Sequence, residues 1–279
     1  MTARRPRSRG PVETTEAQSL LTPPPTPEAP LRVVVATHAT AAFIRPHAHP
    51  DETQVLVPLS GIIRVETETA LWIVPPGKAI VIPASIVHAV SAPVAATLCT
   101  LRLDGTVWPV SGHGERTIAM TPLALAMVEA VTGMTAPPLP GTFGSRLAAL
   151  LLEILRDAPP DGFHVRRPRD PRLRQIVEAL MQDPSDPASL SDWGRRVGAS
   201  DRTLSRLFET EIGMGFRDCR RSIQIHSAVA RLGSGQALSE IAADLGYESL
   251  SAFIHAFRTV VGETPGQMAR RLGARRTAT

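Results

Sequence analysis

Cysteine, lysine and long apolar runs are scarce in this chain of 279 residues. Its two cysteines, Cys99 and Cys219, lie too far apart for the short spacings of zinc or redox sites, so we expect two buried, reduced thiols and a cytoplasmic protein. No apolar run approaches the roughly 20 residues that cross a bilayer. The basic start of the chain is not followed by the apolar segment of a secretory signal. These absences argue against secreted and membrane-spanning proteins.

Lysine occurs once, at Lys78, and arginine supplies the rest of the positive charge. Residues 158–279 hold 18 arginines and 14 acidic residues, a net charge of +4, whereas residues 31–157 hold 8 basic and 9 acidic residues. Arginine suits bidentate contacts to guanine and phosphate, although the base composition of a genome can produce the same bias. The charge is compatible with a nucleic-acid partner for the C-terminal part but does not demonstrate one.

The N-terminal half of the chain contains two segments of different composition. Residues 1–30 include TPPPTPEAP and lack apolar periodicity, so we expect a disordered tail. Residues 31–116 show a period of two between frequent turn signals, which is typical of an antiparallel β-sandwich or barrel. We predict strands over the following ranges: Leu31–Thr37, Gln54–Pro58, Ile62–Glu66, Leu71–Val74, Ala79–Ile82, His88–Ser91 and Ala95–Leu103.

Two histidine-containing motifs lie in the predicted β domain. The first reads RPHAHPDETQVLVPLSG from Arg45 to Gly61, and the second reads GKAIVIPASIVH from Gly77 to His88. Their spacings resemble the two motifs of the cupin barrel. The resemblance implies that the histidines point into one barrel mouth, where they form an effector pocket or hold a divalent metal such as Zn²⁺, Fe²⁺ or Ni²⁺. The implied pocket residues are His47, His49, Gln54 and His88.

Three positions depart from the cupin pattern. Gln54 stands where the family has an acidic metal ligand, Ser85 where it has a glycine, and Ala92 where it has an asparagine. A neutral amide is a poorer metal ligand than a carboxylate. Two interpretations therefore stay open: the histidines bind a metal ion, or they form hydrogen bonds to an organic ligand or to one another.

Residues 117–157 change to a helical period. Thr121 and Pro122 form a helix cap and first helical position. After the break APPLPG, a second helix carries a wide apolar stripe that packs either on the barrel or on another subunit. Residues 158–170 are rich in proline and charge, so we expect an extended, exposed linker. The stripe consists of Leu147, Leu150, Leu151, Ile154 and Leu155.

Residues 171–272 are predicted to form a helical domain with two similar units. Each unit consists of a short helix, a tight turn at a glycine and a second helix with a serine cap, which is Ser200 in the first unit and Ser249 in the second. Ser189 and Asp192 form a variant of the capping box at the start of the first unit. A long helix joins the units. We therefore predict two helix-turn-helix units, each able to lay a helix in a DNA major groove.

The motifs of this domain resemble those of one family. They read GASDRTLSRLF at 198–208, ALSEIAADLGYESLSAFIHAFR at 237–258 and GETP at 262–265. In combination they resemble the DNA-binding domain of the AraC/XylS transcription regulators. The resemblance implies a regulator, more often an activator, that binds promoter DNA as a homodimer, contacts RNA polymerase and responds to a small molecule in its barrel. The residues it implies for DNA contact are Arg202, Thr203, Ser205, Arg206, Leu250, Ser251 and His255, with Arg258 at phosphate.

The predicted fold is therefore multidomain: a cupin-like barrel (31–116), a helical dimerisation segment (117–157), the linker and an all-α domain. The alternative is a metal-dependent cupin enzyme or a metal sensor fused to a DNA-binding domain. Gln54 argues against the enzyme, as does the lack of a general acid other than Glu52, so we expect no catalysis.

Two departures from the regulator family concern the DNA-binding helices. Gly194 replaces the usual alanine, which costs up to about 1 kcal/mol of helix propensity. His255 replaces the usual arginine, and a neutral histidine gives up a guanine contact worth ~1–3 kcal/mol. We therefore expect the second unit to read less sequence than the first.

Overall fold

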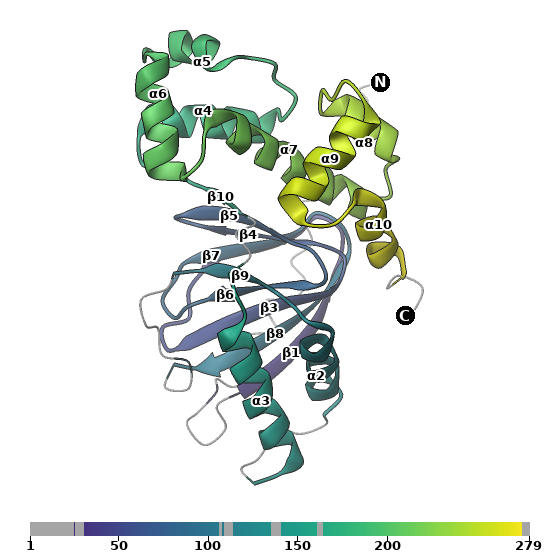
Figure 1. Ribbon diagram of the computed structural model, residues 1–279. Coiled ribbons are helices and arrows are strands. Elements are labelled where there is room, and N and C mark those ends of the chain that lie inside the picture. Colours follow the sequence, from purple (N-terminus) through teal and green to yellow (C-terminus); the bar gives the residue numbers. More distant parts are fainter. Residues whose placement is uncertain are drawn as a thin grey trace, which may run out of the picture.

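The computed structural model describes residues 25, 31–105, 108, 114–134, 141–160 and 164–274. The expected disordered tail lies, apart from Pro25, outside these residues. Figure 1 shows a β domain beneath a helical domain, with a pair of helices on the side of the β domain that faces away from the helical domain. No helix in the described part of the chain is long and apolar enough to cross a membrane.

The β domain consists of two five-stranded antiparallel sheets. One has the strand order β1-β8-β3-β6-β9 and the other the order β10-β5-β4-β7-β2. The predicted class, an N-terminal β domain followed by helices and a helical C-terminal domain, is confirmed. The strands are β1 (Leu31–His38), β2 (Ala42–His47), β3 (Glu52–Ser60), β4 (Ile63–Thr67), β5 (Ala70–Val74), β6 (Lys78–Ile82), β7 (His88–Ala92), β8 (Ala96–Asp104), β9 (Arg116–Ala119) and β10 (His164–Arg166).

Each predicted strand is present, and each end lies within one or two residues of its predicted place. The sequence pattern does not predict β2, β9 or β10. In β2 the period is interrupted because the pairing with β7 shifts at a bulge between Ile44 and His47. The short strand β10 pairs only with β5, which is remote in the sequence. Such pairing leaves little local signal.

Alternation of side chains along the strands separates two apolar layers of the β domain. Leu56, Val65 and Trp72 belong to the layer between the sheets. Val55 and Leu101 point the other way, to the outer face of the first sheet. That outer face is covered by α2 (Pro122–Thr132) and α3 (Phe143–Asp157), as Figure 1 also shows.

Helix α2 begins at its predicted cap, and α3 packs on the β domain, which is one of the two alternatives for its apolar stripe. Thr121 caps α2 through its side chain. On α3, Leu151 and Leu155 are buried against the sheet. Leu150, however, is 49% exposed, so the predicted stripe is wrong at this position. The reason is that the buried face is rotated toward Leu152, leaving Leu150 at its edge.

Both cysteines are buried free thiols, as expected. Cys99 lies in the outer layer of the β domain and Cys219 in the helical domain. Burial raises the pKa of each thiol to about 12. Near neutral pH both therefore stay protonated and unreactive.

The helical domain is divided between two apolar cores. The first core gathers the first helix-turn-helix unit with α4 and the start of α7. The second gathers the rest of α7 with α8, α9 and α10. Each unit thus has its own core, and α7 belongs to both. The elements are α4 (Pro171–Gln182), α5 (Leu190–Val197), α6 (Asp201–Leu207), η1 (Phe208–Ile212), α7 (Phe216–Gly233), α8 (Leu238–Asp244), α9 (Leu250–Val261) and α10 (Pro265–Ala274).

The segment predicted as an exposed linker docks on the β domain instead. His164–Arg166 forms the edge strand β10, and Val165 is only 3% exposed because it joins the first core of the helical domain. Arg167 Nη2 lies 2.8 Å from Glu66 Oε2 on β4. The expectation of full exposure is therefore wrong: pairing with β5 satisfies backbone groups that an isolated linker would leave to water.

A second contact joins the domains through apolar side chains. Ile62 and Ile73 of the β domain pack in one cluster with Ile225 and Val229 of α7. Near the end of α7, a Cβ on Gly233 would lie 2.8 Å from Ile62 Cδ1, which shows how closely the helix approaches the β domain. The helical domain is thus held at two places, at β10 and at α7.

Candidate functional site

The three motif histidines come together at one end of the β domain. The bulge in β2 brings His47 opposite His88, the first residue of β7. His49 lies just after β2 rather than on it. The ring centroids of His47 and His88 are 4.4 Å apart, and those of His47 and His49 are 5.0 Å apart. One ligand nitrogen from each ring lies within 4.8 Å of the others.

Backbone carbonyls set which ring nitrogens carry protons. His47 Nδ1 donates to Arg45 O at 2.8 Å, and His88 Nδ1 donates to Ile86 O at 3.0 Å. In the neutral tautomer, Nε2 of each ring then offers a lone pair. The Nε2 atoms of His49 and His88 are buried and have no hydrogen-bond partner among the described residues. These Nε2 atoms could therefore accept a hydrogen bond from a donor or coordinate a metal ion.

Burial disfavours the charged forms of His49 and His88. It lowers the pKa of His88 to about 4. The hydrogen bond to the Ile86 carbonyl raises this pKa by a smaller amount, and repulsion from His47 and His49 lowers it slightly further. Burial also lowers the pKa of His49, and His47 adds to that shift. Neutral imidazoles can bind a divalent metal or accept hydrogen bonds from an organic ligand.

Gln54 is buried on β3, on the same strand face as Glu52. Glu52 forms a buried bidentate ion pair with Arg102, in which Nε and Nη2 each lie 2.7 Å from a carboxylate oxygen. This pair was not expected from the sequence. The sequence contains one indication of this pair: buried polar residues replace apolar ones at neighbouring ends of β3 and β8, where Glu52 and Arg102 lie. Because Glu52 is committed to Arg102, it is a poor general acid.

Ser85, which replaces the cupin glycine, has a left-handed backbone with φ +66°. Its backbone N–H donates to His49 O at 2.8 Å, and its hydroxyl donates to Pro50 O at 3.2 Å. The strained residue therefore fastens the segment that carries His49 to the loop before β7. It contributes to the geometry of the cluster although it does not belong to it.

The first helix-turn-helix unit has the predicted caps and turn. Ser189 and Asp192 form a complete capping box at the start of α5. Gly198 ends that helix with φ +67°, a conformation that glycine adopts without strain. The Ser200 hydroxyl then accepts from Thr203 N at 3.2 Å and caps α6. Local hydrogen bonds alone thus fix where the second helix of the unit begins.

The face that α6 presents to solvent carries the predicted DNA-contacting residues. Leu204 and Phe208 are fully buried. Arg202, Ser205 and Arg206 are exposed. Thr203 is half-buried, and its hydroxyl lies 2.9 Å from that of Ser200. Cationic and polar side chains at the N-terminal part of a second helix are suited to contact base edges.

The second unit repeats this arrangement in α8 and α9. Ser249 caps α9 by accepting from Ala252 N at 3.2 Å, and Phe253 and Phe257 are fully buried. The predicted contact residues of this unit all lie on the exposed face. They are Leu250 (41% exposed), Ser251, His255 and Arg258.

Helix α7 connects the two units through specific contacts that the sequence does not predict. Arg220 donates to the carbonyls of Ala188 and Asp186, just before α5. One turn later, Gln224 Nε2 donates to Leu245 O of the second unit at 2.9 Å. With both apolar cores also sharing α7, the two exposed helices are held at a fixed spacing.

Comparisons with known proteins agree with this arrangement. Residues 193–271 match a family model described as a helix-turn-helix domain. The chain is 30% identical over 221 residues to the HTH-type transcriptional regulator NimR of Escherichia coli, covering 78% of this chain and 80% of that protein. It is 33% identical over 105 residues to the HTH-type transcriptional regulator GlxA of Rhizobium meliloti, covering 37% of this chain and 32% of that protein.

Among solved structures, ToxT from Vibrio cholerae aligns with 87% of this chain and 99% of its own, at 12% identity and a TM-score of 0.39. The relatives that share this domain are transcription regulators, and the chain is a DNA-binding regulator rather than an enzyme. The match to NimR spans 221 residues and therefore extends well beyond residues 193–271. This chain belongs to the AraC family of helix-turn-helix transcription regulators.

Proposed function

We propose that the protein is a cytoplasmic, sequence-specific regulator, most simply an activator, that a small molecule controls by binding beside the barrel histidines. The observation that carries the DNA part of this proposal is the pair of capped, exposed helices α6 and α9, held on one connector. Two such helices would enter successive major grooves about one helical turn, ~34 Å, apart.

In this proposal the two units read DNA unequally. Arg202 and Arg206 of α6 make the main base contacts, supported by Thr203 and Ser205. Leu250, Ser251 and His255 make weaker contacts because a neutral imidazole lacks the bidentate fork of arginine. Arg258 lies a further turn along α9 and is exposed, which suits a contact to phosphate.

The ligand part of the proposal rests on the cluster of His47, His49 and His88. Unpartnered Nε2 atoms of His49 and His88 would accept hydrogen bonds from a ligand, and Gln54 would offer an amide on the neighbouring strand. Binding would alter regulation by shifting the balance between docked and undocked arrangements of the domains. The contacts of Ile62 with α7 are one element whose stability the ligand would change.

We also propose homodimer formation and contact with RNA polymerase, as is common in the family. Leu150 on α3 and Leu123 and Phe143 on the helix starts are 49%, 58% and 71% exposed. Large exposed apolar side chains on neighbouring helices favour burial against a second copy. Promoter DNA would then carry two copies of the site.

The test is a fluorescence anisotropy titration of promoter DNA with Arg202→Ala, Arg206→Ala and the double variant. Loss of two base contacts of ~1–3 kcal/mol each predicts that the double variant binds roughly 30-fold more weakly or worse. Arg156→Ala is the matched control, because this exposed arginine lies at the end of α3, away from the face that carries Phe143 and Leu150 and on the opposite side of the β domain from α6. Affinity of the double variant equal to that of the control would remove the assigned reading helix.

A second candidate function, that of a metal sensor, is favoured by the convergence of the histidine nitrogens. Imidazole binds Zn²⁺ at about 2.0–2.1 Å, which places nitrogens that share a tetrahedral ion roughly 3.3 Å apart. The ligand atoms of the three rings lie within 4.8 Å of one another, so they would have to move closer together to hold an ion. Metal content of untagged protein, measured for wild type and His49→Ala, tests this candidate. Stoichiometric metal that the variant loses, with metal-dependent DNA affinity, supports a sensor; absence of stoichiometric metal leaves the organic ligand.

A further inference from the structure

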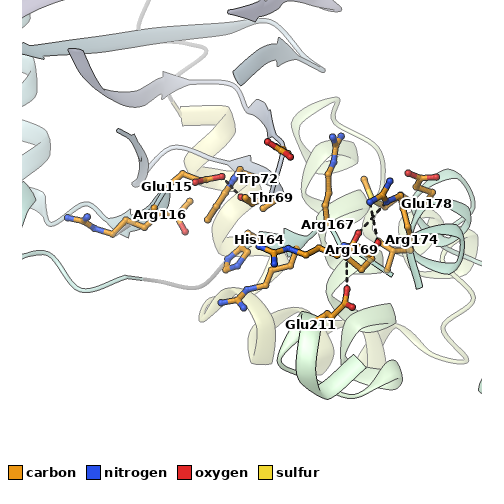
Figure 2. Close-up of a pocket in the computed structure, with 18 of the residues that line it drawn as sticks. Thr69, Trp72, Glu115, Arg116, His164, Arg167, Arg169, Arg174, Glu178 and Glu211 are labelled. Atoms are coloured by element: carbon orange, nitrogen blue, oxygen red, sulfur yellow. Dashed lines mark hydrogen bonds between the residues drawn. The ribbon is translucent and has the colours of Figure 1, made fainter. Parts of the chain in front are cut away.

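A large cleft separates the rim of the β domain from the first helix-turn-helix unit. Its volume is about 1270 Å³, which exceeds the ~300–1,000 Å³ of an ordinary ligand pocket. Residues of β5 and β9 line one side, β10 and the segment after it line the floor, and α4 and η1 line the other side. Figure 2 shows Trp72 and His164 on the barrel side, opposite Arg169, Arg174 and Glu211. This cleft is distinct from the histidine cluster.

Several arginines line the cleft without a carboxylate partner. Arg64 and Arg167 are paired with Glu66. Within the described part of the chain, no ion pair involves the others. Arg174 donates to the carbonyls of Pro168 and Arg169. The arginines without an ion pair are Arg116 on β9, Arg166 on β10, Arg169 and Arg174.

Two of the acidic side chains in the cleft are already engaged with hydrogen-bond donors. Glu115 accepts hydrogen bonds from the hydroxyls of Thr67 and Thr69. Glu211 accepts from the backbone N–H of Arg169 at 2.6 Å and of Asp170 at 3.0 Å. These hydrogen bonds leave the carboxylate charges in place, and Glu68 and Glu178 also line the cleft. The six arginines of the lining nevertheless outnumber its four acidic side chains. The cleft keeps cationic groups that can accept an anion.

Two aromatic side chains, Trp72 and His164, line one side of the cleft, and the indole N–H of Trp72 is a potential hydrogen-bond donor. Trp72 stacks on His164 with ring centroids 4.3 Å apart. Trp72 is 3% exposed, and its Nε1 is buried with no hydrogen-bond partner among the described residues. A buried indole N–H without an acceptor is costly. His164 is only half-buried, so a planar ring in the cleft could extend the stack.

We propose that this cleft binds a small organic anion that carries a planar ring. The oxyanion, a carboxylate or a phosphate ester, is held by Arg166 and Arg169; the ring lies against His164; and Trp72 Nε1 donates to an acceptor atom of the ligand. Because the walls belong to both domains, such a ligand stabilises the docked arrangement over any undocked one. This goes beyond the proposed ligand at the histidines, since it assigns a second site.

The test is isothermal titration calorimetry on the full chain, without DNA and at constant ionic strength. The probes are benzoate and phenyl phosphate, with acetate and inorganic phosphate as the corresponding anions without a ring. We expect one equivalent of a ring-bearing anion to bind more tightly than its ringless counterpart. Whichever of benzoate and phenyl phosphate binds more tightly identifies the oxyanion.

Variants assign the binding to the cleft. Arg166→Ala/Arg169→Ala removes two exposed side chains and is expected to weaken binding at least tenfold, whereas Arg146→Ala on α3 leaves it unchanged. Trp72→Phe keeps a ring but removes the N–H, and weaker binding is expected. Equal binding by wild type and the double-arginine variant, or no binding of any probe, overturns the proposal.

Two further outcomes separate this site from the functions proposed above. Loss of benzoate binding in His49→Ala, with binding retained in the arginine variant, would move the ligand to the barrel histidines and overturn the cleft. The DNA test on Arg202 and Arg206 involves neither the cleft nor the probes, so the regulator assignment and the cleft fail separately.

Discussion

At the scale of single residues, Ser85 shows how a strained position can be maintained beside the histidine cluster. Its φ of +66° is one that a side chain disfavours by ~1–2 kcal/mol. Its two hydrogen bonds, to His49 and Pro50, compensate for that strain. Strain and hydrogen bonding can be separated, because glycine and alanine both lack the hydroxyl but only glycine is free of the strain.

We therefore expect Ser85→Gly to be more stable than Ser85→Ala by about 1–2 kcal/mol. The measurement is the free energy of unfolding from urea titration of both variants. Equal midpoints with equal slopes would mean that the backbone at position 85 is relaxed in solution, which would contradict the left-handed geometry.

His88 gives the cluster a pH dependence of stability. Its folded-state pKa of about 4 lies below the ordinary value of 6.5, so the unfolded chain binds more protons between these limits. The stability that depends on neutral His88 is fully present above pH 6.5 and is lost as the pH falls to about 4. The shift corresponds to a loss on the order of 3 kcal/mol.

We expect that replacing His88 with glutamine flattens this part of the stability profile. The free energy of unfolding of metal-free protein would be measured between pH 7 and 4 for wild type, His88→Gln and the control His255→Ala, which changes an exposed histidine on α9. A wild-type slope that persists unchanged in His88→Gln would show that another group carries the effect.

At the scale of elements, the turn of the first unit explains a departure from the family. A Cβ at Gly194 would lie 2.6 Å from the carbonyl oxygen of Ala199. Alanine there would gain up to about 1 kcal/mol of helix propensity, but it would push against the backbone of the turn that leads into α6. The missing side chain is thus a requirement of this turn and not only a cost.

We predict that Gly194→Ala lowers the melting temperature, whereas Ser191→Ala, at an exposed position of the same helix, leaves it equal or slightly raises it. Thermal unfolding followed by circular dichroism distinguishes the two. A gain in Gly194→Ala as large as the propensity difference would mean that the turn shifts freely.

Elements whose signals are local were predictable from the sequence. The caps at Ser189, Ser200 and Ser249 depend on side chains within three residues of the backbone they bind, so the start of each helix could be predicted. The convergence of His47, His49 and His88 was also predictable, because all three belong to two motifs with recognisable spacing. What was not predictable depends on partners remote in sequence. Arg102 meets Glu52 across strands, and β10 acquires its hydrogen bonds only from β5.

At the scale of the whole molecule, the β domain and the DNA-binding domain are joined at two places. Strand β10 forms the edge of the second sheet of the β domain and lies next to the first helix-turn-helix unit. Helix α7 packs on Ile62 and Ile73 beside the second unit. In the proposed mechanism, a ligand that alters either contact would change how freely the two units align on DNA. Coupling of this kind needs no rearrangement inside either unit, because each has its own apolar core.

The measurement that tests the central claim most directly is hydroxyl-radical footprinting on the promoter DNA that the protein binds. With α6 and α9 in successive major grooves, each copy should protect two stretches on one face of the duplex, with centres about 10 base pairs apart. Weakened protection of one stretch only is expected for Arg202→Ala/Arg206→Ala. A single protected stretch, or two on opposite faces of the duplex, would contradict the account.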